Sequence, residues 1–293
     1  MKYSYYPGCS LHATALEFDL STKAVFNSLG LTLEEVPDWN CCGATSAHST
    51  SESLNIGLNL RNLTIAESAQ NDLVIPCAAC YNNTKITDYL VRNGHEQAKE
   101  INSEMLWTLG KSYQATINVK HALEIVATDE MLANIKKTVV NPLKGLKVAC
   151  YYGCLLLRPS KMVAIDDPEQ PKKMNKLMTV LGAEPVRWSA QTECCSGSAS
   201  ISQTEVALDL VKNIIASAKA SGADVIACAC PLCFTNLDTR QQKAIEEKIV
   251  EKPMPILYFT ELMGLAMGLK DAQGWLKTHL VESVSVFESA NLL

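Results

Sequence analysis

The chain has 293 residues, an apolar fraction of 47% and a net charge of −5 at neutral pH. This length allows two ordinary domains with their own cores, and the acidic balance argues against a nucleic-acid partner, which requires a basic face. Residues 1–6 contain no apolar secretory stretch before the first cysteine, so we expect a cytoplasmic protein whose thiols stay reduced.

The first half of the chain alternates short apolar strands with helices. Residues 2–6 predict a strand, and Leu16, Leu20 and Ala24 then recur every four residues, as expected for one face of a helix. The same reasoning predicts strands at residues 31–36 and 73–75 and a helix at residues 51–70.

The second half repeats this order. Its matching elements are strands at residues 146–149 and 224–227 and helices at residues 171–181 and 202–220. Short strands that alternate with helices predict an α/β fold, with a small, mostly parallel sheet flanked by helices in each half. We therefore expect two pseudo-symmetric repeated domains.

We place the linker between these domains at residues 141–145. The first domain then covers residues 1–141, with a helical insertion at about 94–140 that has no clear counterpart, and the second covers residues 142–293 with a C-terminal helix. The most apolar stretch, residues 256–267, is shorter than a bilayer span and contains a glutamate. We interpret it as a buried terminal helix, with docking on a partner protein as the alternative, and expect no direct membrane insertion.

Ten of the twelve cysteines belong to a five-cysteine pattern that occurs twice. Each copy has one cysteine directly after a glycine, then two adjacent cysteines, then a Cys-x-x-Cys motif. The second of the adjacent cysteines lies 35 positions before that motif in both copies. We call the copies the first set (Cys9, Cys41, Cys42, Cys77 and Cys80) and the second set (Cys154, Cys194, Cys195, Cys230 and Cys233).

Five thiolates in each set favour a cluster of several iron atoms. Thiolates are soft ligands that bind zinc, copper(I) or iron–sulfur clusters, and a structural zinc site needs only four ligands. Adjacent side chains reach one small ion only with backbone strain, whereas a polynuclear cluster offers each thiolate a different iron. Zinc in one set and disulfide bonds are the alternatives. Disulfides are disfavoured because adjacent cysteines close a strained ring and unexported thiols stay reduced.

The two remaining cysteines, Cys150 and Cys228, fall in apolar strand-like runs. Free cysteine behaves as a small hydrophobic residue and is commonly buried. We expect both to be core residues that bind no metal.

The thiol motifs carry a resemblance to a known family. Tyr-Pro-Gly-Cys at residues 6–9, Cys-Cys-Gly at 41–43, Cys-x-x-Cys at 77–80 and the second copy through Cys233 resemble the CCG-domain family, and most closely the B chain of heterodisulfide reductase. The resemblance implies a non-cubane 4Fe–4S cluster in each set, with all ten cysteines as ligands. One departure is Ser196, which follows the second cysteine pair where a glycine follows the first. Because glycine permits close backbone approach, identical geometry of the two clusters does not follow.

Members of this family reduce a mixed disulfide of two thiol cofactors, coenzyme M and coenzyme B in methanogens. The resemblance therefore implies a catalytic subunit that reduces a disulfide by two electrons. We expect two clusters that face one cavity, so that each delivers one electron. The resemblance also implies two partner chains, one ferredoxin-like and one that contains flavin. The alternative function is an iron–sulfur electron-transfer or docking subunit of a succinate/fumarate or hydroxyacid oxidoreductase complex.

Other side chains near the thiol motifs are candidates for proton donation, anion binding or shielding of a cluster. His12 and His48 are candidate proton donors to a substrate thiol, because histidine titrates near neutral pH, but neither has a histidine counterpart in the second copy. Arg158 either binds an anionic substrate or lies at the surface, as most such charges do. Trp39 and Trp188 precede the cysteine pairs and either shield a cluster from water or pack in the core.

Overall fold

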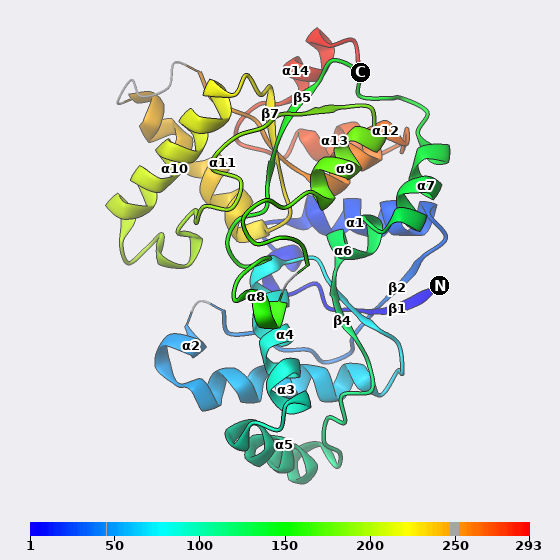
Figure 1. Ribbon diagram of the computed structural model, residues 1–293, viewed down its shortest axis with the longest axis vertical. Helices are drawn as coiled ribbons and strands as arrows, with labels where there is room; N and C mark the ends of the chain where they lie inside the picture. The colour runs from blue at the N-terminus through cyan, green and yellow to red at the C-terminus, as the bar shows by residue number, and fades with distance from the viewer. Residues whose placement is uncertain (45, 164, 247–251) are drawn as a thin grey trace.

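The computed structural model describes residues 1–44, 46–163, 165–246 and 252–293. Figure 1 shows two α/β halves stacked along the long axis, with the N-terminal half below and the C-terminal half above. Each half contains a four-stranded sheet whose neighbouring strands all pair in parallel. The expected pair of repeated α/β units is thereby confirmed.

The two sheets have the same strand order. In the first sheet, ordered β2-β1-β3-β4, the strands are β1 (Lys2–Tyr5), β2 (Thr32–Glu35), β3 (Leu73–Ile75) and β4 (Val119–His121). In the second sheet, ordered β6-β5-β7-β8, they are β5 (Lys147–Tyr151), β6 (Glu184–Pro185), β7 (Val225–Cys228) and β8 (Ile256–Tyr258). All residues of β3 and β7, one of the two inner strands in each sheet, are buried, which explains their unbroken apolar sequences. Cys150 and Cys228 lie on β5 and β7 with no exposed surface, which confirms them as core residues.

Helices cover the sheets. Those of the first half are α1 (Leu16–Ser28), α2 (Ala47–Thr50), α3 (Glu52–Glu67), α4 (Ala78–Arg92), α5 (Glu96–Leu109), α6 (Ala122–Val126) and α7 (Asp129–Thr138). Those of the second half are α8 (Ser160–Val163), α9 (Lys173–Val180), α10 (Thr204–Ala220), α11 (Pro231–Glu246), α12 (Phe259–Ala266), α13 (Ala272–Leu276) and α14 (Val284–Ser289). Two short 3-10 helices, η1 (Cys9–His12) and η2 (Gly197–Ala199), complete the described elements. None of the helices in these described ranges is both long and apolar enough to cross a bilayer.

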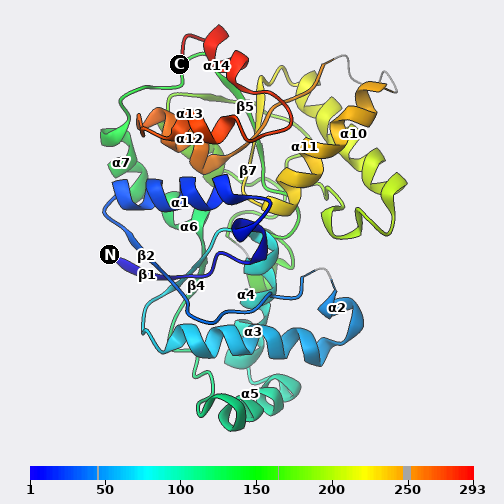
Figure 2. The ribbon, with the colours of Figure 1, turned by 180° about the vertical axis from the view of Figure 1, so that it is seen from behind.

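Helix α1 is present as predicted but is buried on a different face. Leu16 and Leu20 are 50% and 47% exposed, whereas Phe18 and Val25 are fully buried. The reason is tertiary, because α1 packs against α12 of the other half, as Figure 2 shows from behind. Periodicity alone does not reveal which face a helix buries when its packing partner lies in a distant segment.

The segment at 94–140 contains a strand that its sequence did not reveal. Strand β4 joins the first sheet as β8 joins the second, so this part of the chain does have a counterpart. In both halves a glutamate near the start of the next helix accepts a hydrogen bond from the backbone N–H of the last strand residue. Glu124 accepts from His121 at 3.4 Å, and Glu261 accepts from Tyr258 at 2.8 Å. Each fourth strand has only three residues, too few to give a clear alternation in sequence.

The apolar stretch at 256–267 is likewise a strand followed by a helix, not one terminal helix. Strand β8 ends at Tyr258 and α12 begins at Phe259; every residue of both is buried. The ring of Phe18 in α1 stacks on Tyr258 with a centroid distance of 4.0 Å. This segment therefore docks the second half on the first half of the same chain.

Candidate functional site

Every thiol motif follows the carboxyl end of a strand. Cys9 begins η1 after β1, the pair Cys41 and Cys42 follows β2, and Cys77 directly precedes α4 after β3. In the second half Cys154, the pair at 194–195 and the Cys-x-x-Cys motif follow β5, β6 and β7 in the same way. Parallel strands present their carboxyl ends at one edge of a sheet, so residues far apart in sequence meet there.

The thiols of the first set approach one another in pairs. The sulfur atoms of Cys9 and Cys41 lie 3.9 Å apart, and those of Cys42 and Cys80 lie 3.3 Å apart. Cys9 and Cys41 are exposed, whereas Cys42, Cys77 and Cys80 are buried. The first set therefore has two sulfurs at the surface and three inside.

The second set repeats this arrangement. The sulfur atoms of Cys195 and Cys233 lie 3.5 Å apart, and the neighbouring thiol of Cys194 raises the pKa of Cys154. Cys194 is exposed and Cys154 is half-buried, whereas Cys195, Cys230 and Cys233 are buried. The two sets influence each other in the interior, because the neighbouring thiol of Cys230 raises the pKa of Cys77.

Two glycines make room for the buried sulfurs. A Cβ atom on Gly8 would lie 2.7 Å from the sulfur of Cys80, and one on Gly153 would lie 3.3 Å from the sulfur of Cys233. Both glycines also have positive φ values, 74° and 66°, which other residues adopt only with strain. This explains the Gly-Cys sequence that opens each set.

The residue after each cysteine pair donates its backbone N–H to the first sulfur of that pair. Gly43 donates to Cys41 over 3.4 Å, and Ser196 donates to Cys194 over 3.3 Å. Both residues are left-handed, with φ values of 76° and 59°. Ser196 therefore adopts the glycine conformation at a cost, and the backbone around the two pairs is alike despite the departure from Cys-Cys-Gly.

We expect the substitution Ser196→Gly to raise the free energy of unfolding by up to about 1 kcal/mol, because a left-handed conformation costs other residues about 1–2 kcal/mol and glycine almost none. The matched change Gly43→Ala should have the opposite sign, since its Cβ would lie 2.5 Å from that of Ala47. Anaerobic denaturant titrations of both variants measure these effects. A stability gain for Gly43→Ala would contradict the interpretation.

Two asparagines that were not predicted from the sequence form hydrogen bonds with the backbone of the adjacent cysteine pairs. Asn83 donates to the backbone oxygen of Cys42 over 3.3 Å, and Asn236 donates to that of Cys195 over 2.5 Å. Each lies three residues after the last cysteine of its set, so the repeat is Cys-x-x-Cys-x-x-Asn. Extending the alignment of the two copies past the cysteines would have found them.

The first cysteine of each pair has a lowered pKa. Hydrogen bonds from the Cys42 and Cys9 thiols lower the pKa of Cys41 to about 2. A hydrogen bond from Cys154, helped by the Ser196 N–H, lowers the pKa of Cys194 to about 6. Each set thus holds a thiolate at its exposed side, and thiolate is the form that binds metal.

The donors of each set fit a soft metal centre, because all five are sulfur atoms. Among the residues with described positions, no group of three or more histidine, cysteine, aspartate or glutamate side chains is arranged to hold a single metal ion. The sulfurs instead form close pairs.

A cavity of about 330 Å³ lies between the halves, and all five cysteines of the second set line it. Residues of α4, among them Ala79, Asn82 and Ile86, form a further part of the lining, and His48 of α2 also contributes. The thiols of the first set are not among the lining residues, which differs from the expected cavity shared by both sets. At the start of α4, the residues that line the cavity are Ala78 and Ala79, which stand between Cys77 and Cys80 in the sequence.

The lining of this cavity is held in place by contacts across the two halves. Asn82 donates its side-chain nitrogen to the backbone oxygens of Leu155 at 2.7 Å and Arg158 at 2.8 Å. The hydroxyl of Tyr81 donates to the backbone oxygen of Val163 at 3.1 Å. Helix α4 is therefore fixed against the loop that follows Cys154.

The two candidate histidines lie in different surroundings. His48 lines the cavity, whereas His12 pairs with Glu35 at 3.1 Å and lies edge-on to the ring of Trp39. Trp188 is almost fully buried and donates to the backbone oxygen of Cys150. The guanidinium of Arg158 donates to the backbone oxygens of Thr192 and Pro168 and to the carboxylate of Glu169, so it fixes a loop.

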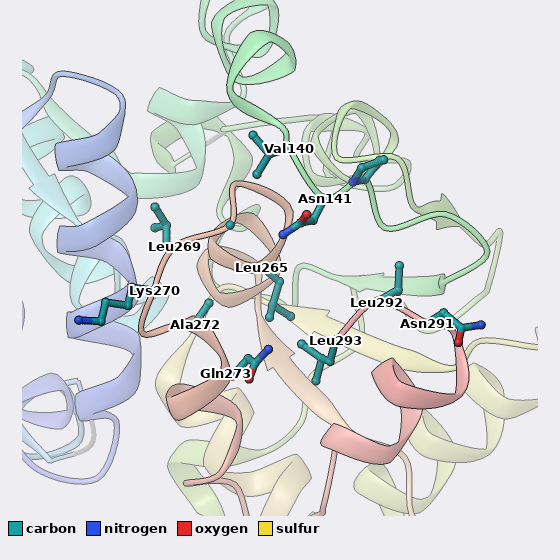
Figure 3. A pocket seen from close by; sticks show the side chains of 12 residues that line it. Val140, Asn141, Leu265, Leu269, Lys270, Ala272, Gln273, Asn291, Leu292 and Leu293 are labelled. Carbon is teal, nitrogen blue, oxygen red and sulfur yellow. The ribbon is translucent and has the colours of Figure 1, made fainter.

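Figure 3 shows another cavity, of about 590 Å³, beside residues 140–142. Val140 and Asn141, the loop after α12 and the C-terminal residues up to Leu293 line it. Its lining contains no cysteine.

Comparisons with known proteins agree with this geometry. The sequence profile of the CCG cysteine-rich domain matches residues 3–85 and 148–238, once in each half. A solved structure from Helicobacter pylori, described as a hypothetical protein, has the same fold, with a TM-score of 0.76 and 16% sequence identity. It covers 96% of this chain, and the chain spans about half (52%) of that structure's length.

Three curated relatives match over almost the whole chain. The membrane anchor of the 8-methylmenaquinol:fumarate reductase of Wolinella succinogenes is 30% identical over 97% of this chain and 99% of its own length. The B chain of the ferredoxin/F(420)H(2)-dependent CoB-CoM heterodisulfide reductase of Methanosarcina acetivorans is 26% identical over 97% and 95%. A protein of Archaeoglobus profundus, described as similar to the B chain of heterodisulfide reductase, is 28% identical over 92% and 91%.

Proposed function

Because the chain belongs to the CCG cysteine-rich-domain family, we propose that it is the disulfide-reducing subunit of a heterodisulfide-reductase-like complex. In this proposal each five-cysteine set holds one 4Fe–4S cluster of the non-cubane type. The observation that supports it most is the cavity between the halves, which places the second set beside a space for a small ligand.

The reaction converts a disulfide, two electrons and two protons into two thiols. When bound, the iron–sulfur clusters would supply the electrons. The ligands would be the ten cysteines of the two sets. The remaining tasks fall to residues of this chain. Helix α4 forms one wall of the cavity, and Asn83 and Asn236 hold the cysteine pairs. To His48, which lines the cavity, we assign the protonation of a departing thiolate.

Electrons reach such a protein from other chains. The sequence carries no dinucleotide fingerprint and no ferredoxin-type cysteine run. We propose two partner chains, one ferredoxin-like and one that contains flavin, as the names of relatives that use ferredoxin suggest. We place the complex in the cytoplasm, with no direct membrane insertion and no nucleic-acid partner.

The test of this function is an anaerobic titration of the reduced, metal-loaded protein with an organic disulfide, followed by electron paramagnetic resonance. We expect the signal of the reduced protein to change and two thiols to form per two electrons consumed. A signal that responds to no organic disulfide, in the isolated chain or in its complex, would refute disulfide reduction.

We expect His48→Gln to lower the turnover number for disulfide reduction by about 100-fold, the low end of the range for general acids. The control is His12→Gln, which removes a histidine that pairs with Glu35 outside the cavity lining and should change turnover less than twofold. Turnover is measured with a reduced viologen as the electron donor. Equal rates for the two variants would remove His48 from the reaction.

A second function is favoured by one observation. The relative with 30% identity over nearly both full lengths is named as part of a fumarate reductase. In that case this chain would carry electrons for a reaction performed on another chain. Co-purification with a dicarboxylate dehydrogenase and quinol-dependent fumarate reduction, without disulfide reduction, would support this alternative.

A further inference from the structure

The groove between α3 and α5 takes no part in the proposed function. Its volume is about 650 Å³, and its two helices lie at the end of the first half that points away from the second half, as Figures 1 and 2 show. We propose that this groove receives an amphipathic helix of a partner protein, with an apolar face and with lysine or arginine residues beside that face. This interaction surface is separate from the cavity between the halves and does not depend on the proposed function.

The floor of the groove is apolar and only partly covered. It is formed by one face of each helix, with Leu54 and Leu58 from α3 and with Ile101, Met105 and Leu109 from α5. Residues four apart share a helix face, so the two helices present two apolar rows to the same groove. Ile101 is buried at its base, whereas the side chain of Leu54 is 47% exposed. A groove of this kind accepts the apolar face of another helix.

The rim that α5 contributes is acidic and ends in an exposed tryptophan. Glu100 and Glu104 line the groove, and neither has a salt-bridge partner among the residues whose positions are described. The cation of the lining, Arg61, is already paired with Asp38 at 2.5 Å. Trp107 lies three residues after Glu104, on the same stripe of α5, and its side chain is 89% exposed. Tryptophan is among the residues that contribute most to binding at protein interfaces.

These charges distinguish between the possible occupants. Helices that lie on a membrane surface are rich in lysine and arginine on their polar face, whereas the charged residues of α5 are three glutamates and one lysine. A second copy of this chain, docked through the same groove, would place like charges against each other. A helix with basic residues beside its apolar face complements both the floor and the acidic rim.

Helix α3 connects the groove with the first cysteine pair. Arg61, on the groove side, donates to the backbone oxygen of Asp38 at 2.5 Å and to the side-chain oxygen of Asn40 at 3.1 Å. On another side of α3, the buried Asn59 donates to the backbone oxygen of Cys42 at 3.0 Å. A helix docked in the groove would therefore rest on the helix that holds this pair in place.

The test uses two synthetic amphipathic peptides, one built from leucine and lysine and the other from leucine and glutamate in the same pattern. The α5 residues of the lining run from Gln97 to Leu109, which is about 18 Å of helix, so about 14 residues are long enough to fill the groove. Binding to the metal-loaded protein is measured by calorimetry. We expect the leucine–lysine peptide to bind at least about tenfold more tightly than the leucine–glutamate peptide.

Matched substitutions separate the groove from general attraction to an acidic protein. Leu54→Asp places a charge in the apolar floor and should weaken binding of the leucine–lysine peptide by at least about tenfold. The control is Leu20→Asp, at a leucine of α1 that is also 47% exposed but lies outside the groove, and it should change the affinity by less than about twofold. Replacing both Glu100 and Glu104 with glutamine should also weaken binding, and it leaves the floor intact.

The inference is wrong if the leucine–lysine peptide does not bind, if Leu54→Asp and Leu20→Asp bind it equally, or if loss of both glutamates has no effect. It is also wrong if the wild-type protein binds vesicles of phosphatidylglycerol and phosphatidylcholine and Leu54→Asp does not, because the groove then meets a membrane. Sedimentation velocity tests the third occupant: a wild-type dimer that Leu54→Asp converts to a monomer would assign the groove to a second copy. None of these measurements involves disulfide reduction, so failure of the groove and failure of the proposed function are distinguishable.

Discussion

Replacing Cys194 with serine should reduce the iron content by half and lower disulfide reduction to the background rate. Cys194 is the exposed cysteine of the second set and lines the cavity. Its pKa is lowered to about 6 by the hydrogen bond from Cys154 and by the N–H of Ser196, so it is ready to bind metal as a thiolate. A serine hydroxyl at this place is a hard and protonated donor, which a soft metal centre does not accept.

The expected iron content of Cys194→Ser is about four atoms per chain, compared with about eight in the wild type, because the first set keeps its own cluster of four. The matched control is Cys150→Ala, which removes a cysteine buried in β5 and should keep the full iron content. A Cys194→Ser protein with unchanged iron and unchanged turnover would show that this cysteine is not a ligand.

Replacing Glu261 with glutamine should lower the free energy of unfolding by about 3–5 kcal/mol, the usual cost of removing one partner of a buried ion pair. Glu261 and His279 have no exposed side-chain surface, and their Oε1 and Nε2 atoms lie 2.9 Å apart. The second oxygen of Glu261 accepts the backbone N–H of Tyr258 at the start of α12. Glutamine would leave a buried imidazole without its counter-charge and weaken the start of a helix that joins the two halves.

The stability loss of Glu261→Gln should depend on pH. The pKa of His279 is raised despite burial, because Glu261 lies beside it. A raised pKa in the folded state means that this contribution is complete below the unfolded value of about 6.5 and disappears as the pH rises through the folded value. The difference between wild type and variant should therefore be largest at acidic pH and shrink at alkaline pH.

Denaturant titrations at several pH values measure this effect. The control is Glu205→Gln, which removes an exposed partner of Lys243 and should change stability by less than about 1 kcal/mol. A difference for Glu261→Gln that is below about 1 kcal/mol, or that grows with rising pH, would contradict the account of the buried pair.

The sequence alone predicted the inner strands, the helices α1, α3, α9 and α10, and the grouping of the cysteines at strand ends. These features depend on local signals: β3 is a short apolar run before Pro76, and each cysteine motif follows a strand. Parallel pairing then follows from the alternation of strands and helices.

Features that depend on distant contacts could not be predicted in this way. Helix α1 buries the face that packs against α12. A hydrogen bond of 2.7 Å between Ser21 of α1 and Thr260 of α12 is part of this contact. Only the second cysteine set lines the cavity, because of the way α4 packs against the loop after Cys154. The sequence of either segment alone does not reveal this packing. The asparagines behind the cysteine pairs were detectable, because Asn83 and Asn236 occupy the same position in the two copies.

The central claim is that each five-cysteine set holds an iron–sulfur cluster. Its most direct measurement is the iron and acid-labile sulfide content of the anaerobically purified protein, with a Mössbauer spectrum of the same sample. Two clusters predict about eight iron atoms and about eight sulfides per chain. Stoichiometric zinc without iron, or free thiols that bind no metal under reducing conditions, would contradict the claim.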